Sequence, residues 1–305
     1  MIERSPYFDA FTYAVMIIGL GLVVFPFWVV IVAASQSLQE VSSVPISLLP
    51  SDQLWVNLSE AWERGGLGTK MLNSMIVSVG VTIGKITLAA MSAFAIVFFN
   101  FRSRMICFWL IFITLMLPLE VRIVPTYAIA ANALMPFQAI LDVTGLTWLV
   151  QTVSGVQVSL NWNLLNSYTG LILPLVATAT GTFLYRQFFM TIPDELVEAS
   201  KMDGASAMEF FWDVLIPLSR TNMLALATIM FVSSWNQYLW PLLITTDREN
   251  FGTAVMQLRF LIPTMNGTPD WNVTMAAALI IMLPPLLVVA FMQRWFVRGL
   301  ISRDK

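Results

Sequence analysis

Histidine, cysteine and charge are scarce or missing in this 305-residue sequence. It has no histidine and one cysteine, Cys107, so it lacks the commonest zinc ligand and general base and cannot form a disulfide within the chain. Charged residues make up 11%, against about 25% in soluble globular proteins. No Gly-rich phosphate loop ending in Gly-Lys-Ser/Thr and no GxSxG nucleophile motif occurs. We therefore expect that the chain is not an enzyme and does not itself hydrolyse ATP.

What remains is strongly apolar. Hydrophobic residues make up 58% and the mean hydropathy is +0.77. An apolar run of about 20 residues can cross the hydrocarbon core as a helix. The sequence therefore predicts an all-α membrane protein with a single transmembrane domain over 1–305. Its six expected spans lie at about 11–34, 72–99, 105–130, 168–189, 221–246 and 272–293.

Three segments between the spans, 35–71, 131–166 and 247–271, are expected on one side of the membrane. The first is predicted to be a loop with a short helix, and the second a surface-lying or re-entrant excursion. Pro284 and Pro285 fall inside the sixth span, where proline is tolerated if neighbouring groups satisfy the freed carbonyls. They predict a broken helix along a pathway.

The distribution of Lys and Arg orients the spans. With both termini, the 100–104 turn and the 185–220 loop on one side, that side carries ten basic residues and the other four. Basic residues favour the cytoplasm, so we expect both termini in the cytoplasm. The ten residues are Arg4, Arg102, Arg104, Arg186, Lys201, Arg220, Arg294, Arg298, Arg303 and Lys305.

The longest charge-bearing stretch is Asp194–Pro217, which holds seven of the 34 charged residues and must lie outside the hydrocarbon. Thr191, followed by Asp194 three residues later, predicts a helix start. The Asp203-Gly204 pair predicts a turn. The segment 191–218 is thus expected to be a cytoplasmic loop of two short helices with an elbow at Gly204, suited to a groove on another protein.

This stretch also resembles a known motif. Glu198-Ala199-Ser200, then Gly204, Val214 and Ile216-Pro217 at the motif's spacing, is similar to the EAA loop of ABC importer membrane subunits. Ser200 stands where that motif usually has Ala, and Val214 and Ile216 replace Ile and Leu. The resemblance implies a coupling helix that docks in a cleft of a cytoplasmic ATPase. The residues it assigns to that contact are Glu198, Ala199, Ser200, Asp203, Gly204, Ala205 and Pro217. An amphipathic loop of another kind of membrane protein is the alternative.

Further stretches carry the same resemblance. WNQYLWPLL at 235–243, LMLPLEVRIVPTY at 115–127 and QRWFVRGL at 293–300 look like the carbohydrate-type family of binding-protein-dependent ABC permeases, and most like its sn-glycerol-3-phosphate importer subunits. The likeness covers nearly the whole chain and departs at 131–166.

The resemblance implies a type I ABC importer permease fold in the bacterial inner membrane. Its partners would be lipid, a homologous second permease, a dimer of ATPase subunits that holds ATP and Mg²⁺, and an extracytoplasmic solute-binding protein. This chain itself would bind no cofactor, metal or nucleic acid. The implied solute is sn-glycerol 3-phosphate. A neutral sugar or a glycerophosphodiester remains open, as does an autonomous channel or secondary transporter.

Ionisable residues at membrane depth are candidates for the pathway, because a charge at a helix centre costs about 2.5–3.5 kcal/mol on insertion scales. Lys85 lies in the middle of the second predicted span. It either pairs with a carboxylate or with helix carbonyls, or it faces the path of an anionic solute. Glu120 and Arg122 point in different directions on a regular helix. We expect a structural role for both, with Arg122 a candidate phosphate contact.

The last candidate pathway residues are Trp235, Asn236, Gln237 and Tyr238, inside the fifth predicted span. Trp and Tyr are typical of a membrane interface, whereas Asn and Gln within a span need partners. They form either hydrogen bonds between helices or a polar stripe on the pathway.

Overall fold

The computed structural model describes residues 6–45, 47–114, 117–177, 179–262 and 269–301, which form helices and connecting segments without a β-strand. Within this part of the chain, four helices are long and apolar enough to cross a membrane. The number is up to six if each of two bent helix pairs is one span, namely Glu120–Ala131 with Met135–Val143 and Tyr168–Val176 with Ala179–Phe189. The predicted all-α membrane class is confirmed. In order, the helices are α1 (Pro6–Ser35), α2 (Leu38–Val41), α3 (Leu54–Gly65), α4 (Leu67–Phe98), α5 (Arg104–Ile113), α6 (Leu119–Ala131), α7 (Met135–Val143), α8 (Leu146–Ser154), α9 (Tyr168–Val176), α10 (Ala179–Phe189), α11 (Asp194–Met202), α12 (Ala207–Glu209), the π-helix η2 (Phe210–Leu215), α13 (Ile216–Trp235), α14 (Leu239–Ile244), α15 (Arg248–Phe251), α16 (Ala254–Leu261) and α17 (Trp271–Ile301).

The chain divides into two compact units, the first made of residues up to Met71 together with 257–284. Asn57 of α3 is its main polar anchor. Its side-chain amide donates to the backbone carbonyls of Ala34 and Gln36, both at 2.8 Å, and its carbonyl oxygen accepts from Asn272 at 2.8 Å. The segment predicted as a loop with one short helix, 35–71, contains α2, α3 and the start of α4.

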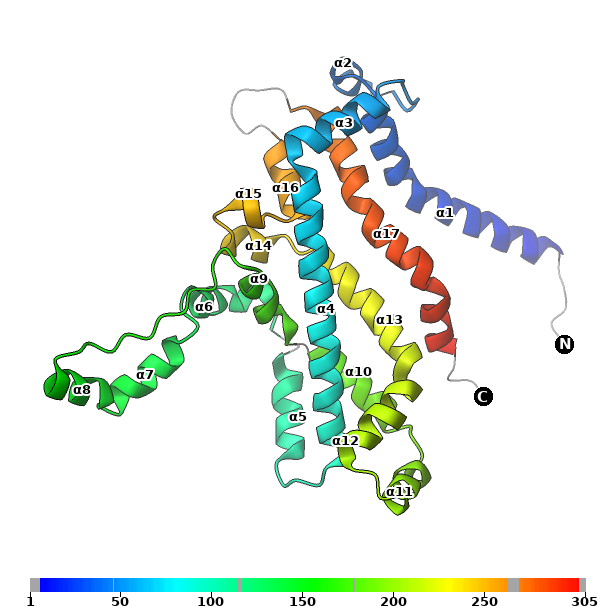
Figure 1. Ribbon diagram of the computed structural model, residues 1–305. Coiled ribbons are helices and arrows are strands. Elements are labelled where there is room, and N and C mark those ends of the chain that lie inside the picture. Colours follow the sequence, from blue (N-terminus) through cyan, green and yellow to red (C-terminus); the bar gives the residue numbers. More distant parts are fainter. Residues whose placement is uncertain (1–5, 46, 115–116, 178, 263–268, 302–305) are drawn as a thin grey trace. The chain divides into compact units, whose positions relative to one another are not determined.

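The second unit is organised around α4, which is continuous from end to end (Figure 1). Two clusters of buried side chains line it. The distal cluster, around Val77 and Val81, includes residues of α6, α9 and α14. The loop-side cluster, from Ala89 to Phe94, includes residues of α10, η2 and α13.

Two of the predicted spans are each divided into two helices. The predicted third span, 105–130, is two helices, with α5 ending at Ile113 and α6 beginning at Leu119 after Pro118. The predicted fifth span, 221–246, is also divided, because α13 ends at Trp235 and α14 begins at Leu239. Pro241 explains this second break, since it has no N–H to bond the carbonyl four residues earlier.

Other prolines act differently. The fourth predicted span consists of α9, with Pro174 inside it, and α10. The expected break at Pro284 and Pro285 is wrong, because α17 runs as one 31-residue helix through both. The bilayer tolerates such prolines where local adjustments satisfy the freed carbonyls.

Close packing of α4 on α9 fixes the region between the two clusters. A Cβ atom at Gly80 would lie 2.7 Å from the Ile172 side chain, and one at Gly84 would lie 2.7 Å from Val176. Glycines four apart let helix backbones approach closely in membranes. The Gly80 and Gly84 pair therefore sets the position of the last turn of α9 beside Lys85.

We predict that Gly84→Val destabilises the protein, because overpacking costs about 1–3 kcal/mol. Thermal unfolding in detergent should show a lower midpoint than the parent protein. Gly19→Val in α1 is the control, since a Cβ there meets nothing within 4 Å. Equal midpoints for the two variants would contradict the close approach.

Candidate coupling and translocation site

The charged loop folds largely as expected from its sequence. α11 spans Asp194–Met202, with Asp194 and Glu195 in the first turn and Lys201 in the last, the arrangement that the helix dipole favours. The helix begins in the predicted region, but Thr191 does not cap it. Pro193 precedes the helix without a side-chain cap, and the Thr191 hydroxyl donates instead to the carbonyl of Phe188 at 2.7 Å.

The elbow is at Gly204, whose φ of +77° lies in the left-handed region that favours glycine. The chain then enters α12 through a capping box. The Ser206 backbone N–H donates to the Glu209 carboxylate at 2.6 Å, and the Glu209 N–H donates to the Ser206 hydroxyl at 3.3 Å. The predicted turn is confirmed, and two reciprocal bonds fix the direction of the chain after it.

The proposed docking residues are accessible. No residue of α11 is buried. Glu198, Asp203, Gly204 and Pro217 are exposed, and the three small residues of the set are half-buried: Ala199, Ser200 and Ala205. The loop therefore offers a free helix surface at one end of α4 (Figure 1).

Aromatic side chains attach this loop to the bundle. The Phe211 ring lies 4.9 Å from that of Phe94, centroid to centroid, and Phe210 lies 5.4 Å from Phe98. Phe98 also lies 6.0 Å from Phe189 of α10. These residues share the loop-side cluster, and Val197 of α11 packs against it. Displacement of the loop must therefore move α4, α10 and α13 with it.

From Ala207 to Trp235 the chain forms one helical rod of 29 residues, with η2 near its start. Pro217 lies at the beginning of α13. Its ring would clash with the carbonyl four residues earlier, and the wider turns of a π-helix accommodate such an interruption. The rod runs from the loop to the break at 236–238.

Lys85 lies on α4 midway between the two clusters, one turn from Val81 and one from Ala89. It forms no ion pair with the other residues described by the structure. Arg122, near the start of α6, is close enough for the two positive charges to interact. The Nε of Arg122 is buried without a hydrogen-bond partner. Lys85 and Arg122 thus lie in the same region of the second unit.

Among the described residues, Glu120 forms no ion pair with either cation. Glu120 is exposed, in the first turn of α6, where a negative charge complements the helix dipole. Among the residues placed by the structure, no group of three Asp, Glu or Cys is arranged to hold a metal ion.

The predicted polar stripe at 235–238 is a break between helices rather than the middle of one. Trp235 ends α13 and is buried, Asn236 is exposed, and Gln237 and Tyr238 are half-buried. Non-helical backbone at membrane depth is tolerated where it is buried in protein or lines a water-filled cavity. Because α13 packs along α4 in the loop-side cluster, this break lies near the level of Lys85.

The sequence reasoning missed the aromatic attachment. The signal was present, because Phe-Phe pairs occur at 98–99, 188–189 and 210–211. Most of these pairs lie in or beside apolar runs, where adjacent phenylalanines look like ordinary membrane-facing residues unless the rings that they contact are known.

The site and fold are those of a transport permease. Residues 85–302 match the family described as binding-protein-dependent transport system inner membrane component, and the chain belongs to this family. It is a multi-pass membrane permease subunit of an ABC importer.

Individual relatives show which permeases of this class the chain resembles. The chain is 47% identical, over the full length of both, to the sn-glycerol-3-phosphate transport system permease protein UgpE of Yersinia pestis. It is 47% identical to the protein of that name in Pectobacterium atrosepticum and 46% in Escherichia coli, again over both full lengths. A chain from the crystal structure of a bacterial ABC transporter that imports the acidic polysaccharide alginate shares the fold, with a TM-score of 0.72, 19% identity, and coverage of 97% of this chain and 99% of that one.

We predict that Phe211→Ala destabilises the attachment of the loop, because truncating a buried phenylalanine costs about 3–5 kcal/mol. The thermal midpoint should fall and proteolysis within 191–206 should accelerate. Phe11→Ala is the control, since Phe11 is 67% exposed. Unchanged cleavage in Phe211→Ala would mean that the loop is held by other contacts.

Proposed function

We propose that this chain carries sn-glycerol 3-phosphate across the bacterial inner membrane as one of two permease subunits of an ATP-driven importer. Its partners are a homologous permease, an ATPase dimer that holds ATP and Mg²⁺, and an extracytoplasmic solute-binding protein. Full-length similarity to relatives bearing that solute in their names supports the substrate. The physical observation that carries the proposal is the pair of cations Lys85 and Arg122, for which the described part of the chain provides no ion-pair partner.

A phosphate group suits this pair. A buried charged donor without an acceptor is costly, and an anion supplies the missing acceptor. Guanidinium binds phosphate oxygens with matched geometry, while a lysine ammonium contributes a point charge. A permease for a neutral sugar has no need of two such charges at the same depth. Gln237 and Tyr238, half-buried at the neighbouring break, are suited to the glycerol hydroxyls.

The proposed coupling starts at α11. Glu198, Ala199, Ser200, Asp203, Gly204 and Ala205 contact the ATPase, with Pro217 at the start of the following helix. ATP binding draws the ATPase subunits together and moves α11. The aromatic contacts pass this motion to the rod from Ala207 to Trp235, whose far end is the break beside the cation pair. Rigid-body motion of this kind couples distant sites.

The orientation that fits this scheme places α11 and both termini in the cytoplasm. The turn between α4 and α5, which holds Arg102 and is followed by Arg104 at the start of α5, lies at the same end of α4 as the loop (Figure 1). Of the basic residues that favour this orientation, Arg4, Arg303 and Lys305 lie outside the described residues.

We predict that glycerol 3-phosphate, and not maltose, stimulates ATP hydrolysis by the reconstituted complex with its binding protein. Lys85→Met and Arg122→Gln should each lower transport by roughly tenfold or more, since a hydrogen bond to a charged group contributes about 1.5–3 kcal/mol. Arg102→Gln, in an exposed turn, should transport normally. Stimulation by a neutral sugar instead would remove the role of the two cations, and failure to assemble with an ATPase would remove the importer.

A second prediction concerns the elbow. Gly204→Val should lose transport and co-purification with the ATPase, because a left-handed conformation costs an ordinary residue about 1–2 kcal/mol. Since a Cβ at this position meets nothing within 4 Å, the effect comes from backbone conformation alone. Gly204→Asn is the matched control, because Asn tolerates this conformation. Full coupling in the Val variant would show that the elbow is dispensable.

A further inference from the structure

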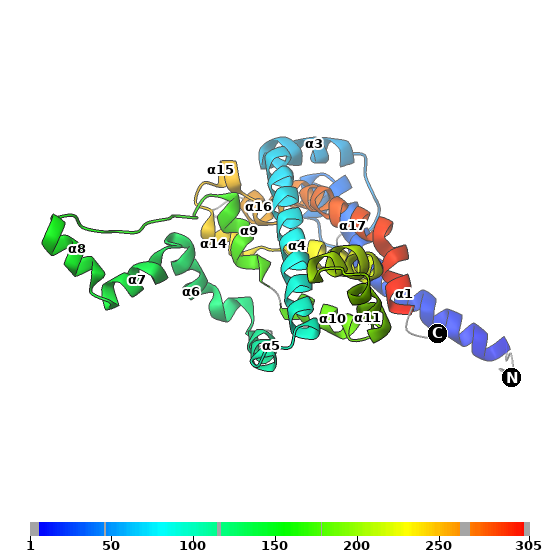
Figure 2. The same ribbon diagram turned by 60° about the horizontal axis from the view of Figure 1, so that its bottom comes forward.

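The excursion from Asn132 to Asn163, here called the arm, leaves the rest of its unit as α7, α8 and an extended return segment (Figure 2). Side-chain amides hold the return segment in place. Gln138 donates to the carbonyl of Val158 at 3.3 Å and accepts from the N–H of Leu160 at 2.9 Å. Asn132 donates to the carbonyl of Leu160 at 3.0 Å and accepts from the N–H of Trp162 at 3.1 Å.

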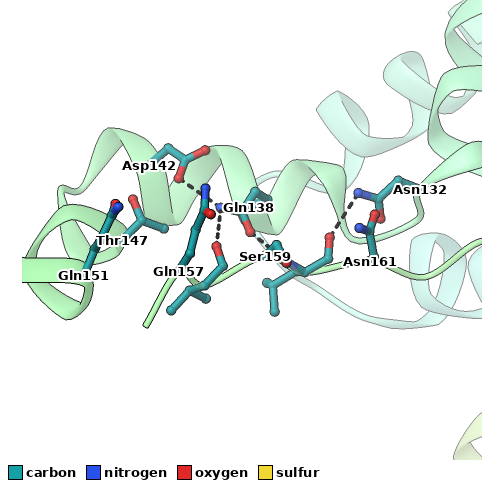
Figure 3. Close-up of a pocket in the computed structure, with 10 residues that line it drawn as sticks. Asn132, Gln138, Asp142, Thr147, Gln151, Gln157, Ser159 and Asn161 are labelled. Carbon is teal, nitrogen blue, oxygen red and sulfur yellow. Dashed lines mark hydrogen bonds between the residues drawn. The ribbon is translucent and has the colours of Figure 1, made fainter. Parts of the chain in front are cut away.

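The inner side of the arm is polar. A cavity of about 370 Å³ lies between the two helices and the return segment (Figure 3). Gln138 and Asp142 are four residues apart on α7 and joined by a hydrogen bond of 3.0 Å, and Thr147 and Gln151 are four apart on α8. Residues at this spacing share a helix face. Polar side chains of the arm thus gather on the face turned to the return segment.

The opposite faces are apolar and uncovered. On α7, Ile140 is 60% exposed and Val143 is 89% exposed. On α8, Leu149 is 50% and Val153 is 83% exposed. On a helix of 3.6 residues per turn, these positions point away from the polar pairs. Both helices are therefore amphipathic, with their apolar sides outward.

Three observations identify what covers this face. The arm continues from α6, whose Val121 and Val124 are 64% and 74% exposed, and α7 leaves α6 at an angle of 77°. α7 therefore does not continue the direction of α6, and the arm projects away from the helices that pack on α4 (Figure 1). Trp148, 66% exposed, and Trp162, 52% exposed, belong to the residue type enriched at the membrane–water interface.

The arm carries almost no charge. Between Arg122 and Arg186 the only Asp, Glu, Lys or Arg is Asp142, which faces the cavity. Because the arm has no cation that could pair with anionic headgroups, its binding at the boundary of headgroups and acyl chains would depend on its apolar area alone.

We propose that the arm lies in the plane of the membrane at its extracytoplasmic surface, with the outward faces of α7 and α8 in the lipid and the polar cavity toward water. The side-chain amides of Gln138 and Asn132 make this position possible. They form hydrogen bonds with backbone groups of the return segment, so these groups need no partner outside the arm. The assignment is independent of the transported solute.

Spin labels at single cysteines test this directly. In full-length protein with Cys107→Ala, reconstituted with its complex in phosphatidylcholine nanodiscs, Ile140→Cys and Val153→Cys report the apolar faces. Gln151→Cys and Asn161→Cys report the polar side. Oxygen concentrates in lipid, so labels at the apolar positions should collide with oxygen several-fold more often than with a water-soluble nickel chelate. Labels at the polar positions should collide more often with the nickel chelate. Val124→Cys on α6 and Met202→Cys on α11, 83% exposed, serve as lipid and water references.

Two results would overturn the proposal. Access of the nickel chelate to Ile140 and Val153 equal to that at Met202 would place the arm in water. Exclusion of both oxygen and nickel from these positions would mean that protein, such as a partner permease, covers them. Replacing part of the phosphatidylcholine with an anionic lipid should leave the pattern unchanged, and a clear shift of labels toward the lipid would contradict the argument from charge. None of these measurements depends on transport or on the solute.

Discussion

The bilayer limits where this chain can place charge and unpaired backbone, and the rest of the structure follows from that limit. A charge at the centre of a membrane helix is costly, and free backbone groups have no water to bond. Yet Lys85, Arg122 and the non-helical residues at 236–238 occur within the apolar part of the chain. Lys85 and the break at 236–238 both lie between the two apolar clusters, which makes a structural accident a poor explanation.

The two clusters form two packed regions along α4 in the second unit. α4 is the continuous element, and close contacts at Gly80 and Gly84 hold α9 against it. The interruption after α13 removes helical hydrogen bonds between the two regions. Such a break needs less energy to deform than an intact helix, because no ladder of bonds must be broken. In the proposed importer, the region on the loop side would respond to the ATPase while the distal region keeps its packing.

Much of this organisation was predictable, and the failures have physical causes. Long uncharged runs identified the apolar spans, and the Asp203-Gly204 pair identified the turn, because both signals are local. Proline was a poor guide, since Pro241 coincides with a break whereas Pro284 and Pro285 lie within a continuous helix. Its effect depends on the tertiary surroundings. The meeting of Lys85 with Arg122 and of Phe94 with Phe211 involves residues 37 and 117 positions apart, which periodicity cannot relate.

The stiffness of the connection between loop and membrane decides whether motion at α11 can reach the cations. α11 alone would transmit little motion to the membrane helices, because none of its residues is buried. The aromatic rings of Phe210 and Phe211 provide the mechanical connection, since they fix the start of the 29-residue rod against α4 and α10. A close-packed interior transmits strain rather than absorbing it. The π-helix lies within this packed region, so that Pro217 is accommodated where neighbouring rings prevent a free hinge. In the proposed importer, displacement of α11 would therefore be delivered at the other end of the rod, at Trp235, where the backbone is interrupted.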